Sequence, residues 1–216
     1  MKTLYIEDIL SQIGQEVELR GWVNTIRDHK KIVFLDIRDN TGIVQVVGGE
    51  DFKALSPEDV ISIKGLVKKR PDKLINAKLK TGSIEIEARS FKLLAKAKEL
   101  PFDMGKETLD LSLPILLDYR SLSLRHPKIK AIFKVQETIV QTFRAHMKNL
   151  GFTEFQAQTM VATATEGGAE VFPIKYFDRT AYLAQSPQFY KQIMVSIFEK
   201  VFTVAHAYRA EPSVTT

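Results

Sequence analysis

Residues 17–47 read VELRGWVNTIRDHKKIVFLDIRDNTGIVQVV and contain three short strand patterns separated by turn residues. Two more follow before residue 95, so that the patterns lie at 17–23, 32–37, 43–47, 60–67 and 84–94. A short helical insert is expected at 51–55. Five short strands in so little sequence predict a small closed or sandwiched β domain. The five-stranded nucleic-acid-binding barrel is one candidate, and a generic small barrel is the other.

A linker and a change of period separate this region from the rest of the chain. Residues 96–117 combine lysines with proline and glycine, as linkers do. From Pro127 to Leu150 apolar residues recur at helical spacing, which predicts a long amphipathic helix that stops at Gly151. Beyond it we expect strands within 152–161, 181–184 and 200–209, a loop at 162–168 and a helix at 187–198. The predicted organisation is a β domain at 1–95, a linker at 96–117 and a second domain at 118–216.

The overall composition is that of a mildly basic globular protein. The chain has 216 residues, of which 44% are apolar and 26% charged, and a formal net charge of +5. These values exclude the disordered and fibrous classes. The absence of cysteine excludes disulfides, thiolate metal sites and thiol nucleophiles. The first residues do not fit a signal peptide and no apolar run is long enough for a membrane helix, so we expect a cytoplasmic protein with no membrane partner.

Several residues of the β region have the chemistry that single-stranded nucleic acid requires. Such binding uses cations for phosphates, an aromatic face for stacking and amides for base edges. Arg27 and Arg38 are the cations, Phe34 is the aromatic residue and Gln45 is the amide. Each has a plainer interpretation. An aromatic inside IVFLDI more often belongs to the core, and an amide inside IVQVV more often faces solvent.

Two motifs of the second domain combine polar residues with an unusual backbone. Glu166 precedes two glycines, which permit close approach of a ligand to the backbone or form a plain turn. Ser186 before Pro187 fits the start of a helix. Gln188 and Lys191 then share one helix face. That face binds either a ligand or water.

Arg209 and Glu211 are expected on the same side of a strand, as a binding pair or as a structural ion pair. Other reaction types find little support in the sequence. It contains no P-loop motif, no G-x-S-x-G and no H-E-x-x-H, and its four histidines are scattered. A P-loop nucleotide site is thereby excluded, and a histidine-based metal site or triad has poor support.

These segments together resemble the class IIb aminoacyl-tRNA synthetases. GWVN at 21–24, VFLDIRD at 33–39 and GIVQVV at 42–47 are similar to their anticodon-binding barrel. Residues 151–165 and 202–216 occupy the positions of the first two class motifs, and YRAE at 208–211 is the core of the second. EGG at 166–168 and QSPQFYKQ at 185–192 are similar to the archaeal and eukaryotic type of aspartyl enzyme, whereas asparaginyl relatives usually lack the lysine. The resemblance implies an α+β protein, with a five-stranded OB-fold barrel and the first part of a class II antiparallel-sheet catalytic domain.

The resemblance also implies roles in binding tRNA. Phe34 would stack on an anticodon base and Gln45 would hydrogen-bond one. Arg27 would contact the anticodon stem or loop. Glu85, in the last barrel strand, would help to read the first anticodon base.

For aspartate and ATP, the resemblance implies a site in the second domain. Lys191 would pair with the side-chain carboxylate of the substrate aspartate. Glu166, Ser186 and Gln188 would surround the α-ammonium group of the same substrate. Arg209 would hold the α-phosphate of ATP and the substrate carboxylate, while Glu211 would receive the adenine amino group. A guanidinium suits this task because it can bridge two anions. Aspartate attacks the α-phosphorus itself, so the reaction needs positioning and charge stabilisation but no protein nucleophile.

Two departures from the family pattern affect what we expect. Gln158 stands where the first class motif normally has a proline that shapes the dimer interface. Thr216 falls inside the second motif, so the ligands for Mg²⁺ and the third motif are expected beyond residue 216. We therefore expect an aspartate–tRNA ligase that is homodimeric at full length, of which this part alone is inactive. The alternatives are a non-catalytic tRNA-binding module and an asparagine–tRNA ligase.

Overall fold

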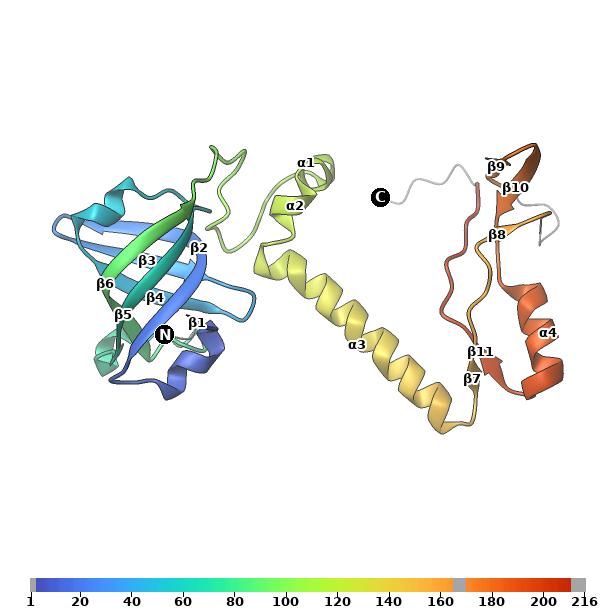
Figure 1. Ribbon diagram of the computed structural model, residues 1–216, viewed down its shortest axis with the longest axis horizontal. Coiled ribbons are helices and arrows are strands. Elements are labelled where there is room, and N and C mark those ends of the chain that lie inside the picture. The colour runs from blue at the N-terminus through green and yellow to red at the C-terminus, as the bar shows by residue number, and fades with distance from the viewer. Residues whose placement is uncertain (1–2, 165–169, 211–216) are drawn as a thin grey trace. The chain divides into compact units, whose positions relative to one another are not determined.

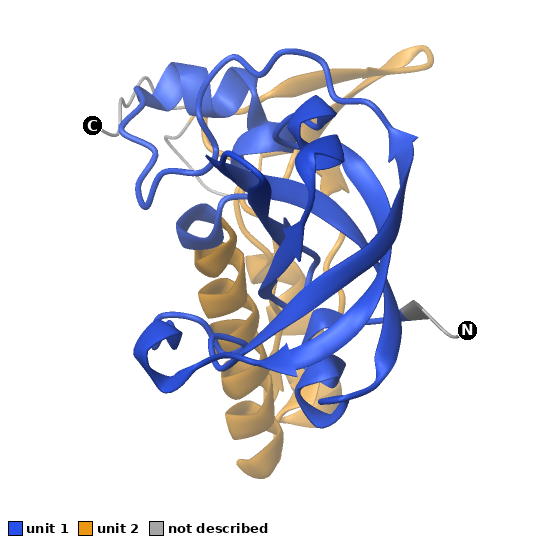
Figure 2. Cartoon of the chain, turned by 90° about the vertical axis from the view of Figure 1, so that its left-hand side faces the viewer, with its two compact units in different colours: residues 1–129 blue, residues 130–216 orange. Residues whose placement is uncertain are grey.

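The computed structural model describes residues 3–164 and 170–210. The chain divides into two compact units, residues 1–129 and residues 130–216, which Figure 2 draws in blue and orange. The division falls near the start of helix α3 (Pro127–Asn149). No helix among the described residues is long and apolar enough to cross a membrane.

The first unit is built around a closed five-stranded barrel (Figure 1). Its strands are β2 (Glu16–His29), β3 (Ile32–Arg38), β4 (Ile43–Gly48), β5 (Val60–Lys69) and β6 (Ile84–Ala95). Neighbouring strands follow the order β2-β3-β4-β6-β5, and β5 pairs again with β2 to close the sheet. The β4–β6 pair is parallel and the other pairs of the barrel are antiparallel. The five predicted strands and the OB-fold barrel are confirmed.

Short elements complete the barrel at its ends. Strand β1 (Thr3–Leu4) pairs in parallel with β2, and the 3-10 helix η1 (Ile6–Ser11) follows it. The predicted helical insert is the 3-10 helix η2 (Glu50–Ala54), and a third, η3 (Asp72–Leu74), lies between β5 and β6. The sequence did not indicate η1. It forms because Ile6 and Ile9 are fully buried in the barrel core.

Apolar side chains at alternate positions along the strands form the core of the barrel. In β3, Val33, Leu35 and Ile37 point inward, while the residues between them lie on the outer face. The same cluster takes Val44 and Val46 from β4. Its other strand residues are Val17, Leu19, Val23, Ile61, Ile63, Val67, Ile84 and Ile86.

Gly21 permits the close approach of two barrel strands. A Cβ atom at this position would meet the carbonyl oxygen of Arg38 and the side chain of Ile37. Because backbone atoms of a paired strand cannot move away without breaking the ladder, only glycine fits here. The GWVN motif therefore has a packing reason for its first residue.

A buried ion-pair cluster ties the segment after the linker to the barrel. Helices α1 (Leu113–Asp118) and α2 (Arg120–Ser123) precede Arg125 in the first unit. The Glu58 carboxylate accepts hydrogen bonds from Arg38 and from Arg125, each at 2.7 Å. Both guanidinium groups also lie over the ring of Trp22, at 5.9 and 5.6 Å from its centroid. One carboxylate thus joins the barrel wall to the chain that leads into α3.

The second unit contains α3 and α4 (Gln188–Phe198) with short strands (Figure 1). Strands β8 (Met160–Val161) and β9 (Pro173–Tyr176) flank β10 (Arg179–Leu183) in one antiparallel sheet. Strand β7 (Thr153–Glu154) pairs in parallel with β11 (Val201–Phe202). The predicted long helix is confirmed, and Gly151 follows it with a φ of +80°.

The strands of this unit differ from their predicted lengths. The segment 152–161 forms the two short strands β7 and β8 instead of one. The predicted strand at 200–209 is wrong beyond Phe202, because only Val201 and Phe202 find a strand partner among the described residues. Strand β9 was not predicted, since it is short and begins with a proline.

Candidate functional site

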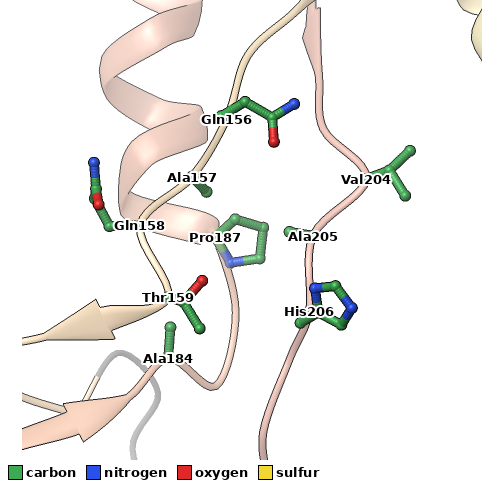
Figure 3. Close-up of a pocket in the computed structure, with 9 residues that line it drawn as sticks. All are labelled: Gln156, Ala157, Gln158, Thr159, Ala184, Pro187, Val204, Ala205 and His206. Carbon is green, nitrogen blue, oxygen red and sulfur yellow. The ribbon is translucent and has the colours of Figure 1, made fainter.

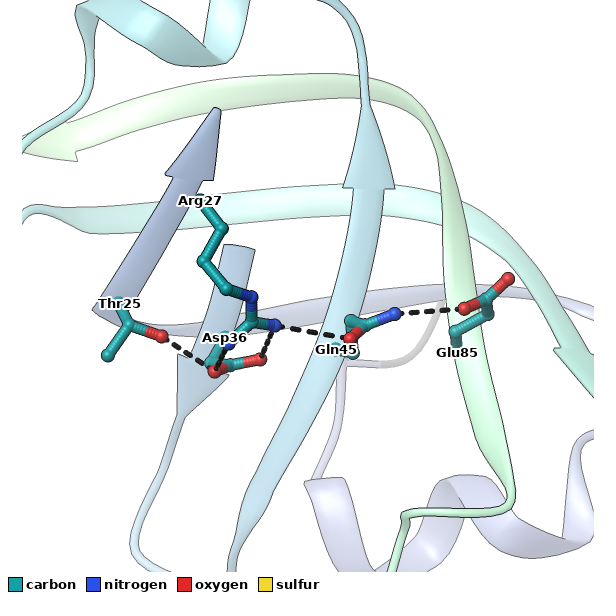
Figure 4. Close-up of polar contacts among 5 residues, drawn as sticks. All are labelled: Thr25, Arg27, Asp36, Gln45 and Glu85. Atoms are coloured by element: carbon teal, nitrogen blue, oxygen red, sulfur yellow. Dashed lines mark hydrogen bonds and ion pairs between the residues drawn. The ribbon is translucent and has the colours of Figure 1, made fainter. Parts of the chain in front are cut away.

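A chain of hydrogen bonds crosses the outer face of the barrel (Figure 4). The Arg27 guanidinium donates to both carboxylate oxygens of Asp36, at 2.7 and 2.9 Å. It also donates to the Gln45 side-chain oxygen at 3.1 Å, and the Gln45 amide nitrogen donates to Glu85 at 3.0 Å. Thr25 donates to Asp36 at 2.6 Å. The structure thus joins Arg27, Gln45 and Glu85, three separately predicted residues, across four strands.

A β-bulge in β2 turns Arg27 toward this face. Val17, Leu19 and Val23 point into the core, so strict alternation would also send Thr25 and Arg27 inward. The register shifts between Val23 and Thr25, which leaves Asn24 as the extra residue. Beyond the shift, Thr25 lies opposite Asp36 and Arg27 opposite Phe34. The bulge thus places the guanidinium on the outer face.

Phe34 lies next to this hydrogen-bond chain. Its strand neighbours Val33 and Leu35 are fully buried, so the Phe34 ring is on the outer face of β3 and only partly covered. The ring of His29 meets it edge-on, with centroids 5.4 Å apart. The core position that its apolar surroundings favoured is therefore not the one observed. The ring is therefore partly exposed on the outer face of the barrel.

Gln45 is held in place on the outer face. Val44 and Val46 fill the core, and Gln45 between them keeps only 9% of its surface exposed. Its coverage comes from being bonded to Arg27 on one side and Glu85 on the other. Glu85 also lies 3.7 Å from the Arg70 guanidinium. Sequence reasoning missed Thr25, Asp36 and Arg70. The alternation of β3 gave a signal for Asp36 alone.

Arg38 does not belong to this face. Its side chain is buried and donates to Asn24 at 2.8 Å and to Glu58 at 2.7 Å. The interpretation of Arg38 as a phosphate ligand is therefore wrong, since its charge is already matched inside the protein.

A second group of predicted residues lies where β10 leads into α4. The Ser186 hydroxyl accepts a hydrogen bond from the backbone N–H of Gln188 at 3.3 Å, as at a helix start. One turn into α4, the backbone N–H of Lys191 donates to the carbonyl of Pro187. Gln188 and Lys191 are exposed at the start of this helix. Gln185, which sequence reasoning did not single out, is 1% exposed just before them.

Arg209 lies between two residues whose backbone N–H groups are hydrogen-bonded to other segments of the second unit. The N–H of Tyr208 donates to the Ala184 carbonyl at 3.0 Å. The N–H of Ala210 donates to the Glu170 carbonyl at 3.1 Å. Arg209, between Tyr208 and Ala210, therefore lies in the segment that is hydrogen-bonded to the β10–α4 connection. Glu166 and Glu211 lie outside the described residues.

A small pocket lies next to this helix start (Figure 3). Three segments line it, namely 156–159 between β7 and β8, Ala184 with Pro187, and 204–206 after β11. Gln158 is one of the lining residues. Within residues 3–164 and 170–210, no group of three or more His, Asp or Glu side chains is placed to hold a metal ion. The described residues therefore do not form a Mg²⁺ site.

Two family models match the chain. Residues 17–94 match the OB-fold nucleic acid binding domain. Residues 112–216 match the tRNA synthetases class II (D, K and N). The chain therefore contains a class II tRNA synthetase domain of the D, K and N group, preceded by an OB-fold nucleic acid binding domain.

The curated relatives that it matches include aspartate–tRNA ligases. The chain is 39% identical to the aspartate–tRNA(Asp/Asn) ligase of Deinococcus radiodurans, covering 100% of this chain and 48% of the relative. It is 41% identical to the aspartate–tRNA(Asp) ligase of Pyrococcus furiosus, covering 100% of this chain and 50% of the relative. The chain thus spans about half the length of the curated relatives it matches.

Solved structures of both aspartyl and asparaginyl enzymes share the fold. The asparaginyl-tRNA synthetase of Pyrococcus horikoshii, complexed with asparaginyl-adenylate, superposes with a TM-score of 0.85 at 34% identity, covering 100% of this chain and 50% of that one. The aspartyl-tRNA synthetase of Entamoeba histolytica gives a TM-score of 0.79 at 25% identity, covering 100% and 47%. The likeness extends over the whole chain.

Proposed function

We propose that the chain is the N-terminal part of an aspartate–tRNA ligase. The barrel binds the tRNA anticodon, and the second unit contributes to the ATP-dependent activation of aspartate and its transfer to tRNA. The observation that carries the proposal is the outer face of the barrel, where Arg27, Gln45 and Glu85 form one polar chain beside the Phe34 ring. Relatives with about 40% identity over this length include aspartate–tRNA ligases.

The anticodon face combines stacking with hydrogen bonding. The partly covered Phe34 ring stacks on one unpaired base, a contact worth about 1–3 kcal/mol. Gln45 and Glu85 hydrogen-bond base edges, and Arg27 contacts the anticodon stem or loop. This division of labour is the one by which proteins read single-stranded RNA loops.

The helix start of α4 binds the amino acid. Lys191 pairs with the side-chain carboxylate of the substrate aspartate. Ser186, Gln188 and Glu166 surround the α-ammonium group of the same substrate. A lysine in this place favours aspartate over asparagine, because the neutral amide of asparagine would leave the Lys191 side-chain ammonium without a charge partner. Support comes from the geometry of α4, which carries Gln188 and Lys191 one turn apart.

Arg209 and Glu211 act on ATP. The aspartate α-carboxylate attacks the α-phosphorus, the bond to the β-phosphate oxygen breaks and pyrophosphate leaves. Arg209 bridges the attacking carboxylate and the α-phosphate, and so stabilises the negative charge that builds up there. Glu211 accepts a hydrogen bond from the adenine amino group. Mg²⁺ would neutralise the phosphates of ATP, with ligands beyond residue 216. We further propose that the full-length enzyme is a cytoplasmic homodimer.

The RNA-binding half of the proposal is tested by Phe34→Ala. The probe is a synthetic stem–loop RNA with the anticodon GUC, and the 216-residue chain is titrated against it by fluorescence anisotropy. Loss of the stacking ring should weaken binding about 5- to 100-fold. The matched control is Phe177→Ala, which removes an exposed ring of the second unit. Equal affinity of both variants and the unchanged chain would contradict the proposal.

The aspartate half is tested by Lys191→Ala in a protein of the relatives' full length that carries this chain. Aspartate-dependent ATP–pyrophosphate exchange should fall at least about a hundredfold, because a charge-assisted contact to the substrate is lost. Lys200→Ala, a lysine after the other end of α4, serves as control. Exchange supported by asparagine instead of aspartate would favour the asparagine enzyme. A protein that binds the stem–loop but catalyses no exchange would favour the non-catalytic module.

A further inference from the structure

The Gln45 amide lies between a group that can only donate and a group that can only accept. On one side, Arg27 donates to its oxygen at 3.1 Å, and on the other side its nitrogen donates to Glu85 at 3.0 Å. A guanidinium has no acceptor and an ionised carboxylate has no donor. Only one orientation of the amide satisfies both neighbours. The reversed amide would place nitrogen against the guanidinium and oxygen against the carboxylate.

The Arg27 guanidinium is held beside Gln45 by two hydrogen bonds to the Asp36 carboxylate. Both terminal nitrogens of the guanidinium donate to the Asp36 carboxylate, at 2.7 and 2.9 Å (Figure 4). Such a two-pronged pair fixes the plane of the guanidinium as well as its position. Thr25 donates to the same carboxylate and fixes it in turn. Asp36 also lies directly opposite Gln45 in the β3–β4 register, so one nitrogen of Arg27 reaches both.

The oriented amide keeps part of its bonding capacity for a ligand. A glutamine side chain has two acceptor positions on oxygen and two N–H donors. The hydrogen bonds to Arg27 and Glu85 use one of each. The remaining acceptor and donor stand in a fixed order along the outer face. Base edges differ in the order of their donors and acceptors, so a fixed amide can select among bases.

We propose that Asp36 is a positioning residue for base recognition. It holds Arg27 so that the Gln45 amide presents its acceptor and its donor to an RNA base in a single order. The proposal rests on the proposed function of the barrel in binding the anticodon. It assigns to Asp36 an effect on which base is preferred, distinct from an effect on stability.

The test compares Asp36→Asn with Gln45→Ala on a set of stem–loop RNAs. The set contains the GUC anticodon and loops in which each anticodon position is replaced in turn by the other bases. The measured quantity is the ratio of Kd for the substituted RNA to Kd for the GUC RNA. Gln45→Ala identifies the position that the amide reads, where the ratio should fall about tenfold. Asp36→Asn should lower the ratio at that same position to nearly the same value, and Asp36→Glu should restore most of it.

A matched control separates this role from the general loss of an ion pair. Arg144 and Glu154 in the second unit form a pair at 2.8 Å with side-chain exposures of 41% and 17%. The corresponding values for Arg27 and Asp36 are 2.7 Å, 45% and 15%. Glu154→Gln should leave the ratios unchanged. Circular dichroism melting of each variant reports whether the barrel is intact.

If Asp36→Asn fails to fold, Arg27→Lys gives the same test. Lysine keeps the positive charge but lacks the planar fork that reaches Asp36 and Gln45 together. Discrimination should again fall about tenfold, although the charge is retained. If Gln45→Ala loses discrimination while Asp36→Asn and Arg27→Lys keep it, the positioning role is wrong and the proposed function stands. If the unchanged chain shows no preference among the RNAs, the proposed anticodon binding fails, and the positioning role fails with it.

Discussion

At the scale of single residues, Glu58 joins the barrel to the segment that leads into α3. Its side chain is almost fully buried and accepts a hydrogen bond from Arg38 and another from Arg125. A buried carboxylate with two charged donors is well compensated, but each donor depends on it. Arg38 in particular is buried and would keep its charge without its main partner.

We expect Glu58→Gln to destabilise the chain by about 3 kcal/mol, as the loss of one partner from a buried ion pair does. Urea denaturation followed by Trp22 fluorescence would measure this, since both arginines lie over the Trp22 ring. The control is Glu137→Gln, which removes an exposed pair with Lys134 on α3 and should cost less than about 0.5 kcal/mol. A Glu58 variant as stable as this control would show that the cluster does not stabilise the fold.

The candidate site shows how far single residues can be predicted from sequence. The types at Arg27, Phe34 and Gln45 indicated nucleic-acid chemistry, but their pattern favoured a core ring and a solvated amide. The structure places the ring outside and bonds the amide on both sides, because each side chain depends on partners from other strands. Such cross-strand partners lie up to 40 residues away in sequence and leave no local pattern.

At the scale of elements, Asp59 joins the start of β5 to the exit of β6. Burial alone would raise the pKa of its carboxyl, but hydrogen bonds from the Ala97 N–H, the Lys96 ammonium and the Ser56 N–H hold that pKa below its usual value. The folded chain therefore binds this proton less tightly than the unfolded chain does. The resulting stabilisation is present above the unfolded-state pKa of about 3.9 and is lost as the pH falls through the lower folded value.

Asp59→Asn should therefore lower the melting temperature by several degrees at pH 7. The difference from the unchanged chain should shrink as the pH falls below the unfolded-state pKa of about 3.9, because the native carboxyl, whose pKa is lower, is protonated only there. Circular dichroism melting from pH 7 down through this range checks this. Glu87→Gln is the control, since that carboxylate is exposed and its pKa is lowered mainly by Lys68. A gap between Asp59→Asn and the unchanged chain that stays constant with pH would contradict the assignment.

Elements with a strong period were the ones that the sequence predicted. The five barrel strands and α3 follow clear alternation or helical spacing, and turns or Gly151 mark their ends. The segment 200–209 also alternates, yet only Val201 and Phe202 form a strand. Alternation states which face a residue takes, whereas a strand also needs a partner for its backbone. The short strands of the second unit depend on that partner more than on their own residues.

At the scale of the whole molecule, the two units differ in how much they bury. The large apolar cluster draws its members from residues 6–86, all in the first unit. In the described part of the second unit, the buried apolar residues are Phe155, Ala184 and Phe202. Neither α3 nor α4 buries a side chain, and Ile139 and Ile197 are more than half exposed. Local stability should follow this difference in buried area.

Limited trypsin digestion of the 216-residue chain should therefore cut the second unit about tenfold faster than the barrel. Mass spectrometry should find a resistant product that contains residues 17–94. Lysines and arginines occur in both units, so the supply of cleavage sites does not decide the outcome. First cuts within β2 to β6 would contradict the expected order.

The bulge at Asn24 decides which side chains of β2 lie on the outer face of the barrel beyond this residue. If Asn24 stayed in a regular ladder without the bulge, strict alternation would turn Arg27 into the interior and Ile26 out to the outer face. Two homologous barrels that differ by one residue before this point present the same side chains beyond it only if the longer strand also has the bulge. An alignment that moves a gap by one position here would transfer the role of Arg27 to the wrong residue. The position of the bulge must therefore be matched before the residues of this strand are compared between proteins.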